Sequence, residues 1–285
     1  MSTGVALVTG ATSGIGAAAA RSLRARGYAV YAAGRRADRL TELSDAGLVP
    51  LELDVTDDVS RVGGIDRILT EHGRIDILVN NAGYGSLGAI EDTSPEEGRR
   101  QFEVNVFGPF RLIQLVLPSM RKEHSGRIVN VSSAGGKIYS PLGGWYHGSK
   151  FALEGMSDSL RVEVAPFSIE VVIVEPGATL TEWGLIAADR IEEASSHGAY
   201  SRPAHALASS LRSDSHRRRS TPATTVANVI VAAATATRPK TRYAVGRGAR
   251  PAILARRILS DRAFDKIAGR VMREPAGSVG PSANG

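Results

Sequence analysis

Cysteine is missing altogether from the 285 residues of this chain. Its absence excludes disulfide bonds, thiol chemistry and cysteine-ligated metal ions. There is also no run of about eighteen or more apolar residues, so we expect no membrane-spanning helix. The N-terminus lacks the basic and then apolar layout of a secretory signal. Together these absences predict a cytoplasmic protein.

Aromatic residues are scarce, at 5% of the chain, whereas charged residues reach 22% and give a formal net charge of +6. The positive charge is concentrated in residues 202–285, which hold 16 basic and only 4 acidic side chains. A basic end of this kind binds nucleic acid or an anionic membrane surface in some proteins, but more often it is a solvated face. We therefore expect no nucleic-acid partner. Membrane-surface binding through this part is kept as a lesser alternative.

Short apolar segments alternate with segments of helical period over the first two thirds of the chain. The expected strands cover residues 4–8, 28–33, 48–53, 75–79, 126–131 and 169–174. The expected helices cover residues 14–26, 36–45, 60–72, 95–122 and 145–167. Strands that alternate with helices pair in parallel through right-handed crossovers, with helices on both faces of the sheet. The sequence therefore predicts an α/β domain with a doubly wound parallel sheet.

The regular alternation fails after Pro176. Residues 178–221 are rich in Ser, Ala, His and Arg, and only residues 185–194 look amphipathic. A segment of that length with little regular structure is usually a functional lid or a mobile loop. We expect it to form a lid over the substrate.

The last part of the chain returns to regular patterns. Residues 222–235 are helical again, residues 242–245 form a last short strand, and residues 251–272 are expected to form one basic amphipathic helix. The expected parts are a catalytic domain over residues 1–247, a C-terminal helix over 248–273 and a disordered tail over 274–285.

A glycine-rich segment joins the first expected strand to the first expected helix. It covers residues 9–16 and reads TGATSGIG. Glycines at positions 10, 14 and 16 permit a tight turn and let backbone N–H groups approach a pyrophosphate at the helix N-terminus. Glycines also serve plain turns, but a position between a strand and a helix favours nucleotide binding.

Tyr146 and Lys150 lie four residues apart in an expected helix, so both side chains project from one face. A free tyrosine has a pKa of about 10, and a nearby cation favours the phenolate and lowers that pKa. The pair therefore has the form of a general acid/base. Taken alone, a tyrosine and a lysine at this spacing are more often an ordinary helix surface.

Further motifs favour a catalytic pair over an ordinary helix surface for Tyr146 and Lys150. The spacing TGxxxGxG resembles the short-chain dehydrogenase/reductase family, and the other motifs of that family follow in order over about residues 4–182. They are Asp54 and Val55 after the third strand, NNAG at residues 80–83, Asn105 in the long helix, Ser133 thirteen residues before Tyr146, and then Pro176, Gly177 and Thr181. Residues 133–167, with Arg242, Tyr243 and Gly246, are most similar to the type 1 17β-hydroxysteroid dehydrogenase and retinol dehydrogenase branch.

The resemblance implies a single Rossmann-type domain with strand order 3-2-1-4-5-6-7 and assigns roles to four residues. Tyr146 would exchange a proton with the substrate oxygen, and Lys150 would lower the pKa of Tyr146 and hold the nicotinamide ribose. Ser133 would orient the substrate oxygen, and Asn105 would hold a water that links Lys150 to solvent. No metal ion is implied, because the nicotinamide does the redox chemistry.

The same resemblance implies a set of cofactor-binding residues. They are Gly10, Thr12, Ser13, Gly14, Ile15, Gly16, Arg35, Arg36, Asp54, Val55, Asn81, Ala82, Gly83, Tyr146, Lys150, Pro176, Gly177 and Thr181. At the end of the second strand, where an acidic residue would select NAD, this chain has Gly34 followed by Arg35. An arginine can pair with a 2′-phosphate through two hydrogen bonds, which favours NADP(H). The alternative is that the two arginines only form a solvated helix start.

We therefore expect an NADP(H)-dependent oxidoreductase that interconverts a secondary alcohol and a ketone, or an alcohol and an aldehyde. The substrate-facing candidates are Tyr84, Lys137, Tyr139, Trp145, Trp183 and the lid. Their aromatic rings favour an apolar substrate, although aromatic rings near a pocket as often only line it without recognising a ligand. The rival is a catalytically silent nucleotide-sensing module on the same fold. Residues 95–122 and 145–167 carry apolar side chains on more than one face, so by resemblance we expect a homodimer or homotetramer.

Overall fold

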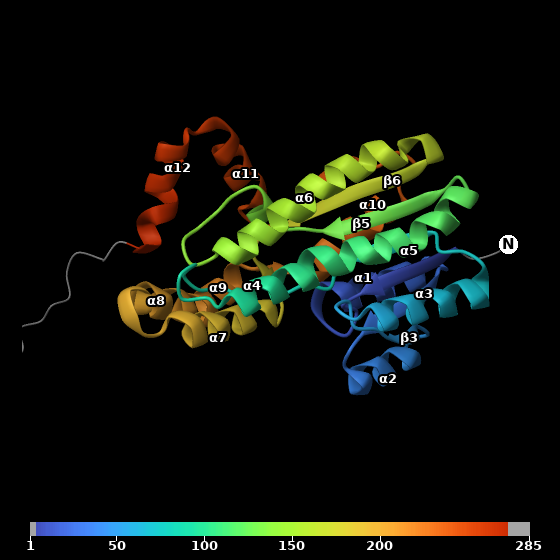
Figure 1. The fold of residues 1–285 in the computed structure, drawn as a ribbon, viewed down its shortest axis with the longest axis horizontal. Coiled ribbons are helices and arrows are strands. Elements are labelled where there is room, and N and C mark those ends of the chain that lie inside the picture. The colour runs from blue at the N-terminus through green and yellow to red at the C-terminus, as the bar shows by residue number, and fades with distance from the viewer. Residues whose placement is uncertain (1–3, 273–285) are drawn as a thin grey trace, which may run out of the picture.

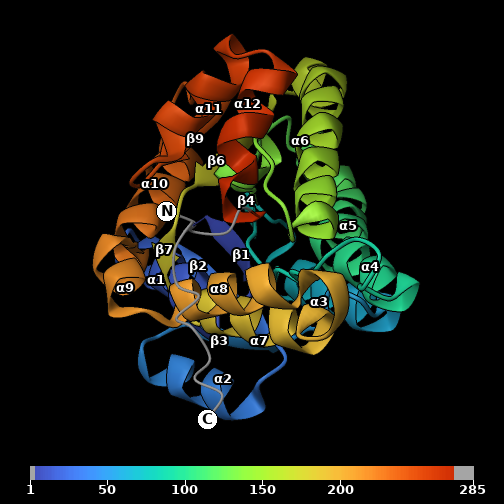
Figure 2. The same cartoon turned by 90° about the vertical axis from the view of Figure 1, so that its left-hand side faces the viewer.

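The computed structural model describes residues 4–272 (Figures 1 and 2). A parallel sheet with strand order β3-β2-β1-β4-β5-β6-β9 runs through its centre. These strands are β1 (Val5–Thr9), β2 (Ala29–Gly34), β3 (Val49–Glu52), β4 (Ile77–Asn80), β5 (Gly126–Val131), β6 (Ile169–Pro176) and β9 (Arg242–Val245). The predicted fold class and strand order are confirmed, with β9 as the seventh strand of the sheet.

Helices cover both faces of the sheet, as the apolar strands require. Successive strand residues point to opposite faces: Ala6 and Val8 of β1 pack in one buried cluster, whereas Val5 and Leu7 pack in the other. The first cluster includes side chains of α1 (Gly14–Ala25), α2 (Ala37–Asp45) and α10 (Ala223–Thr235). The second includes side chains of α3 (Asp58–His72), α5 (Gly108–Lys122) and α6 (Gly144–Val164).

The expected helix over residues 95–122 is interrupted. It consists of α4 (Pro95–Phe102), a π-helical turn over Glu103–Phe107, and α5. Ser94 caps α4 by accepting a hydrogen bond from the backbone N–H of Glu97, at 3.2 Å. Such π-turns are often found at functional sites, and Asn105 lies in the middle of this one.

The expectation of little regular structure over residues 178–221 is wrong. This segment, for which the name lid is kept, contains α7 (Trp183–Ser195), α8 (Ser201–Arg212) and α9 (Asp214–Arg219). A pair of two-residue strands, β7 (Thr179–Leu180) and β8 (Thr221–Pro222), joins its two ends. Small side chains in α7 and α8 form a third buried cluster, including Ala187, Ile191, Ala204 and Ala208. The amphipathic period of residues 185–194 marks part of α7, but the alanines of α8 give only a weak apolar period, so the sequence does not predict α8.

The single C-terminal helix expected over residues 251–272 is also wrong. The chain forms α11 (Ala249–Ile258) and α12 (Asp261–Ala268), followed by a 3₁₀ turn over Gly269–Met272. Leu259 is extended, and Ser260 starts α12 by accepting a hydrogen bond from the backbone N–H of Ala263, at 3.4 Å. The expected tail over residues 274–285 lies outside the described residues, and the division of the chain into parts stays a prediction.

Figures 1 and 2 place the lid helices and the α11–α12 pair at the same end of the sheet. This is the end at which β1, β4 and β5 lead into the loops that carry most of the sequence motifs. From residue 4 to residue 272, no helix is long and apolar enough to cross a membrane.

Candidate active site

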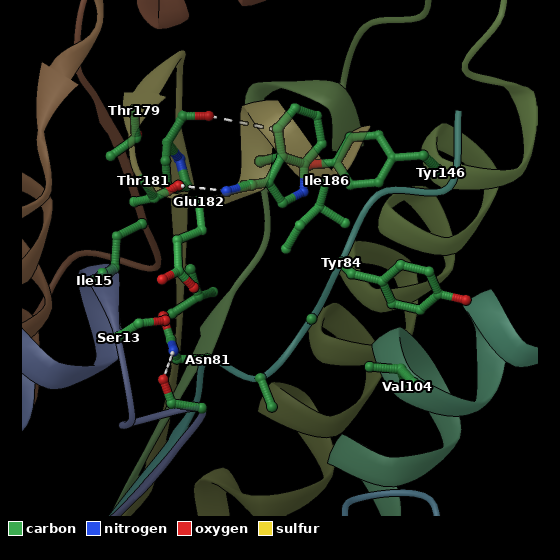
Figure 3. A pocket seen from close by; sticks show the side chains of 18 of the residues that line it. Ser13, Ile15, Asn81, Tyr84, Val104, Tyr146, Thr179, Thr181, Glu182 and Ile186 are labelled. Carbon is green, nitrogen blue, oxygen red and sulfur yellow. Dashed lines mark hydrogen bonds between the residues drawn. The ribbon is translucent and has the colours of Figure 1, made fainter. Parts of the chain in front are cut away.

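A cavity of about 1070 Å³ lies at the carboxyl ends of the parallel strands. It extends from the glycine-rich loop and the end of β2 to Tyr146 and the first turns of the lid, and Figure 3 shows part of its lining. In open α/β sheets, ligands bind at this end, where the strand order reverses between β1 and β4.

The glycine-rich loop needs its glycines for conformation and for space. Gly10 and Gly14 have φ angles of 64° and 54°, in the left-handed region. A Cβ on Gly16 would lie 2.3 Å from the carbonyl oxygen of Gly10, so only glycine fits. Gly16 therefore shapes the loop without lining the cavity.

The start of α1 is suited to an anion. The side chain of Ser13 makes no capping bond there, and the first turn of α1 has no acidic residue. The first backbone N–H groups of a helix carry partial positive charge and bind phosphate readily. Asn81 fixes the loop by donating hydrogen bonds from its side-chain amide to the carbonyl oxygens of Thr9 and Gly10, at 3.0 and 3.3 Å.

Two arginines follow Gly34 at the end of β2, and both line the cavity. Arg36 donates hydrogen bonds to Thr12 Oγ1 and Ser13 Oγ, at 3.1 and 2.8 Å. The Arg35 side chain is 64% exposed and lies 3.6 Å from Asp54. Arg36 is therefore the arginine that turns toward the glycine-rich loop.

The expected catalytic residues meet at the far end of the same cavity. Tyr146 and Lys150 come from α6, Ser133 follows β5, and all three line the cavity. Ser133 accepts a hydrogen bond from the backbone N–H of Gly135 at 2.9 Å. Lys150 Nζ donates to the carbonyl oxygen of Val131 at 3.0 Å.

The pKa of Tyr146 moves opposite to the expected direction. Burial raises the pKa of the phenol to about 12, and a hydrogen bond with Ser133 opposes part of that rise. Burial lowers the pKa of Lys150 to about 8, while Glu154 opposes that shift. The amine of Lys150 is directed to the carbonyl of Val131, so its charge does not hold the phenol pKa down in this arrangement.

Asn105 lies behind the cavity lining. It is 1% exposed, and it donates to the carbonyl oxygen of Tyr84 and to Ser149 Oγ, both at 3.0 Å. A Cβ on Gly83 would lie 3.0 Å from Asn105 Oδ1 and 3.6 Å from Lys150 Nζ. Both polar groups therefore face the small space beside Gly83.

The substrate side differs in part from expectation. Tyr84 and Trp183 line the cavity, and the Trp183 ring lies 5.3 Å from the Tyr146 ring, measured between centroids. Three candidates do not line it. Lys137 pairs with Glu154, Tyr139 contacts Phe264 and Asp265, and Trp145 packs on Phe102.

Four further lining residues were predicted only as part of the lid as a whole and not individually. Glu182, Ile186, Arg190 and His216 lie in the lid and line the cavity. No motif marks them, because the lid was expected to be irregular. Glu182 had one available signal, its position directly after Thr181. Among residues 4–272, no group of three or more His, Asp or Glu side chains could hold a metal ion.

Comparisons with known proteins agree with this geometry. The profile of the family described as short chain dehydrogenase matches residues 4–187. The chain is 42% identical over 174 residues to a 3-ketodihydrosphingosine reductase of Bacteroides thetaiotaomicron. That match covers 61% of this chain and 63% of the reductase, so the chain spans less than two thirds of that relative's length.

Two solved structures match over more of the chain. A short-chain dehydrogenase from Streptomyces avermitilis is 35% identical, with a TM-score of 0.78, and the match covers 95% of this chain and 98% of that one. A variant of actinorhodin polyketide ketoreductase with NADPH is 30% identical, with a TM-score of 0.73, and the match covers 87% and 97%.

Proposed function

We propose that this chain, which belongs to the short-chain dehydrogenase/reductase family, interconverts a ketone and a secondary alcohol with NADP(H) as cofactor. One observation carries the proposal. Ser133, Tyr146 and Lys150 line the same cavity as the glycine-rich loop at the start of α1. A dinucleotide that spans this cavity would bring its reactive end to the only phenol that lies beside both Ser133 and Lys150 in the described part of the chain.

The residues present fit a nicotinamide dinucleotide. Gly16 lets the glycine-rich loop pack closely against the start of α1, whose first backbone N–H groups suit a pyrophosphate. Thr181 would contact the nicotinamide carboxamide, and Asp54 the adenine. When bound, the nicotinamide would accept or supply the hydride.

The choice of NADP(H) rests on Arg35 and Arg36. No carboxylate stands at Gly34 to repel a 2′-phosphate, and Arg36 with Ser13 and Thr12 forms a donor-rich site beside the loop. The similar ketoreductase with NADPH supports the same choice.

Residues of this chain would supply the proton that the carbonyl oxygen takes up. In reduction, Tyr146 would donate its phenolic proton to the oxygen of the carbonyl, whose carbon becomes the carbinol carbon. Ser133 would donate a hydrogen bond to that oxygen and fix its orientation. Lys150 would hold the nicotinamide ribose, and Asn105 would hold the water that returns a proton toward Tyr146.

The substrate we propose is an apolar ketone. Ile138, Ile186, Val104 and Trp183 line the substrate side of the cavity. A relative named as a 3-ketodihydrosphingosine reductase favours a ketone on a long aliphatic chain. The narrower assignment to the hydroxysteroid and retinol dehydrogenase branch stays a prediction.

A panel of carbonyl compounds tests the proposal. Steroid, aromatic and long-chain aliphatic ketones and aldehydes would be incubated with NADPH or NADH, and the loss of ultraviolet absorbance of the reduced nicotinamide would be followed. We expect NADPH-dependent turnover of at least one apolar ketone. Tight NADPH binding without any turnover across the panel would instead support the nucleotide-sensing module.

A further inference from the structure

At the start of the lid, Glu182 forms ion pairs across the cavity with two arginines that follow β2. Glu182 Oε2 lies 3.1 Å from Arg36 Nη1, and Glu182 Oε1 lies 2.9 Å from Arg39 Nη1. The carboxylate therefore uses one oxygen for each guanidinium. The hydrogen bond from Arg39, together with the one from Arg36, lowers the pKa of Glu182, so the carboxylate is ionised at neutral pH.

The same arginine joins the lid to the glycine-rich loop. While it binds Glu182, Arg36 also donates to Thr12 Oγ1 and Ser13 Oγ. Next to Glu182, the methyl group of Thr181 would lie 3.1 Å from a Cβ placed on Gly14. Figure 3 shows Glu182 reaching from the lid toward Ser13. The start of the lid thus lies directly against the loop that would hold the cofactor.

The Glu182 carboxylate occupies a cluster of donors that suits a doubly charged phosphate better than a carboxylate. The cluster offers two guanidinium groups and two hydroxyl groups, and a phosphate with three acceptor oxygens can use more of them than a carboxylate can. The side chains of Glu182, Arg36 and Arg39 are 45%, 40% and 36% exposed. Exposed ion pairs contribute little to stability, so a competing anion can displace this one.

We propose that Glu182 is a cofactor-specificity residue, whose carboxylate competes with the 2′-phosphate of NADP(H) for Arg36 and Arg39. This inference rests on the proposed NADP(H) function. Binding of the 2′-phosphate releases Glu182, and with it the first turn of the lid, whereas NAD(H) offers the arginines no replacement anion. Glu182 thereby weakens NADP(H) binding and couples release of the lid to occupancy of the phosphate site.

Removal of the charge at position 182 separates this role from a structural one. Loss of two exposed ion pairs of about 0.2–1 kcal/mol each corresponds to a two- to thirtyfold change, so we expect Glu182→Gln to bind NADPH more tightly by about that factor. The affinity for NADH should stay within about twofold of wild type. A purely structural ion pair would give the opposite result, because its loss would leave NADPH affinity unchanged or weaker.

The experiment measures dissociation constants by fluorescence titration and needs no carbonyl substrate. NADPH, NADH, adenosine 2′,5′-bisphosphate and AMP would be titrated into wild type, Glu182→Gln and Asp189→Asn. Asp189 is the matched control, because it lies in α7, the helix that Glu182 directly precedes, and its partner Arg212 keeps Glu192. We expect Glu182→Gln to tighten only the two ligands that carry a 2′-phosphate, and Asp189→Asn to tighten neither.

The outcomes distinguish this inference from the proposed function. If wild type prefers NADPH but Glu182→Gln binds it no more tightly, the role of Glu182 is overturned and the cofactor choice survives. If wild type binds NADPH no more tightly than NADH and Glu182→Gln is unchanged, both are overturned. Equal tightening of NADPH and NADH would also overturn the inference, because the gain would not depend on the 2′-phosphate.

Discussion

Tyr146 stays protonated at neutral pH, which suits a proton donor. With its pKa raised by burial to about 12, the phenol is the dominant form across the physiological range. Carbonyl reduction consumes that proton, whereas alcohol oxidation would need the phenolate. In this environment Tyr146 carries the proton that carbonyl reduction needs and would have to lose it before alcohol oxidation.

Removal of the phenolic hydroxyl should abolish most of the turnover. Tyr146→Phe hardly changes the side-chain volume, so folding and NADPH affinity should persist. General acid catalysis is worth about 10²–10⁴-fold, and we expect kcat to fall by that factor. Steady-state kinetics and fluorescence titration would check the two parts separately. A variant that kept more than about a tenth of wild-type turnover would exclude Tyr146 as the proton donor.

Lys150 should give the reduction a pH dependence near the upper physiological range. Its pKa is lowered by burial to about 8, so the amine is charged below that pH and neutral above it. We expect kcat/KM with NADPH to fall as the pH rises through about 8. In Lys150→Arg the cation persists to high pH, so the fall near pH 8 should be absent from whatever activity remains. A wild-type kcat/KM that does not change up to about pH 10 would show that the reduction does not depend on the charge of Lys150.

Arg36 should set the cofactor preference more strongly than Arg35. We expect wild type to bind NADPH at least about tenfold more tightly than NADH, which corresponds to about 1.4 kcal/mol. Because Arg36 contacts Thr12 and Ser13 while Arg35 is largely exposed, Arg36→Ala should remove most of that preference. Arg35→Ala is the matched comparison. A larger loss in Arg35→Ala would assign the 2′-phosphate to Arg35, as the sequence alone predicts.

A buried ion cluster connects the elements α6, β6 and β9. Glu154 and Glu175 have side chains only 2% and 4% exposed, and Arg242 Nε lies 3.0 Å from Glu154 and 3.5 Å from Glu175. Lys137 adds a second cation at 3.1 Å from Glu154. Burial, and next the Glu154 carboxylate, raise the pKa of Glu175 to about 7.

The raised pKa predicts how stability depends on pH. An unfolded glutamate has a pKa of about 4.3, so the folded state holds a proton on Glu175 that the unfolded state has lost between that pH and about 7. The stabilisation is complete below about 4.3 and is lost as the pH rises through about 7. Glu175→Gln stays neutral throughout and lacks this loss.

We therefore expect the unfolding free energy of Glu175→Gln to improve relative to wild type by about 2–3 kcal/mol from pH 5 to pH 8. Urea denaturation at the two pH values measures it. Glu193→Gln is the control, because Glu193 is 63% exposed. A difference between variant and wild type that does not change with pH would contradict the raised pKa.

How far the sequence predicts these elements depends on how strongly each one is patterned. The parallel strands are apolar on both faces, so their positions could be predicted from the pattern, and the family resemblance implied their order and the roles of the loops with Gly10, Ser133 and Thr181. The helix α8 packs through alanines, which give no clear period, and only residues 185–194 of α7 show an amphipathic pattern. The contacts of Lys137 and Tyr139 depend on Glu154 and on α12, and no local pattern encodes contacts so distant in sequence.

Apolar side chains of α6, and of the π-helical turn before α5, are exposed on the surface of the molecule. Phe151 and Val162 are 44% and 71% exposed, and their spacing of eleven residues places them on one face of α6. Phe107, just before α5, is 54% exposed. These side chains suit the homodimer or homotetramer expected from the resemblance.

We predict that wild type is at least dimeric at micromolar concentration, as measured by light scattering. Val162→Lys should shift the equilibrium toward the monomer, because it places a charge within the expected interface. Val59→Lys is the matched control, since Val59 is 81% exposed on α3. A wild-type monomer, or equal effects of the two variants, would argue against an interface formed by α6.

Deuterium transfer from NADPH to the substrate tests the proposed carbonyl reduction most directly. NADPH carrying deuterium at the transferable position would be incubated with the protein and the apolar ketone that it reduces fastest, and mass spectrometry would locate the label in the product. We predict one deuterium on the carbinol carbon for each NADPH consumed by wild type. In Tyr146→Phe we expect most of this deuterium transfer to be lost over the same time. Oxidation of NADPH without label on the carbinol carbon would contradict the proposed carbonyl reduction. A rate of labelling that is the same in Tyr146→Phe as in wild type would contradict the role of Tyr146 as proton donor.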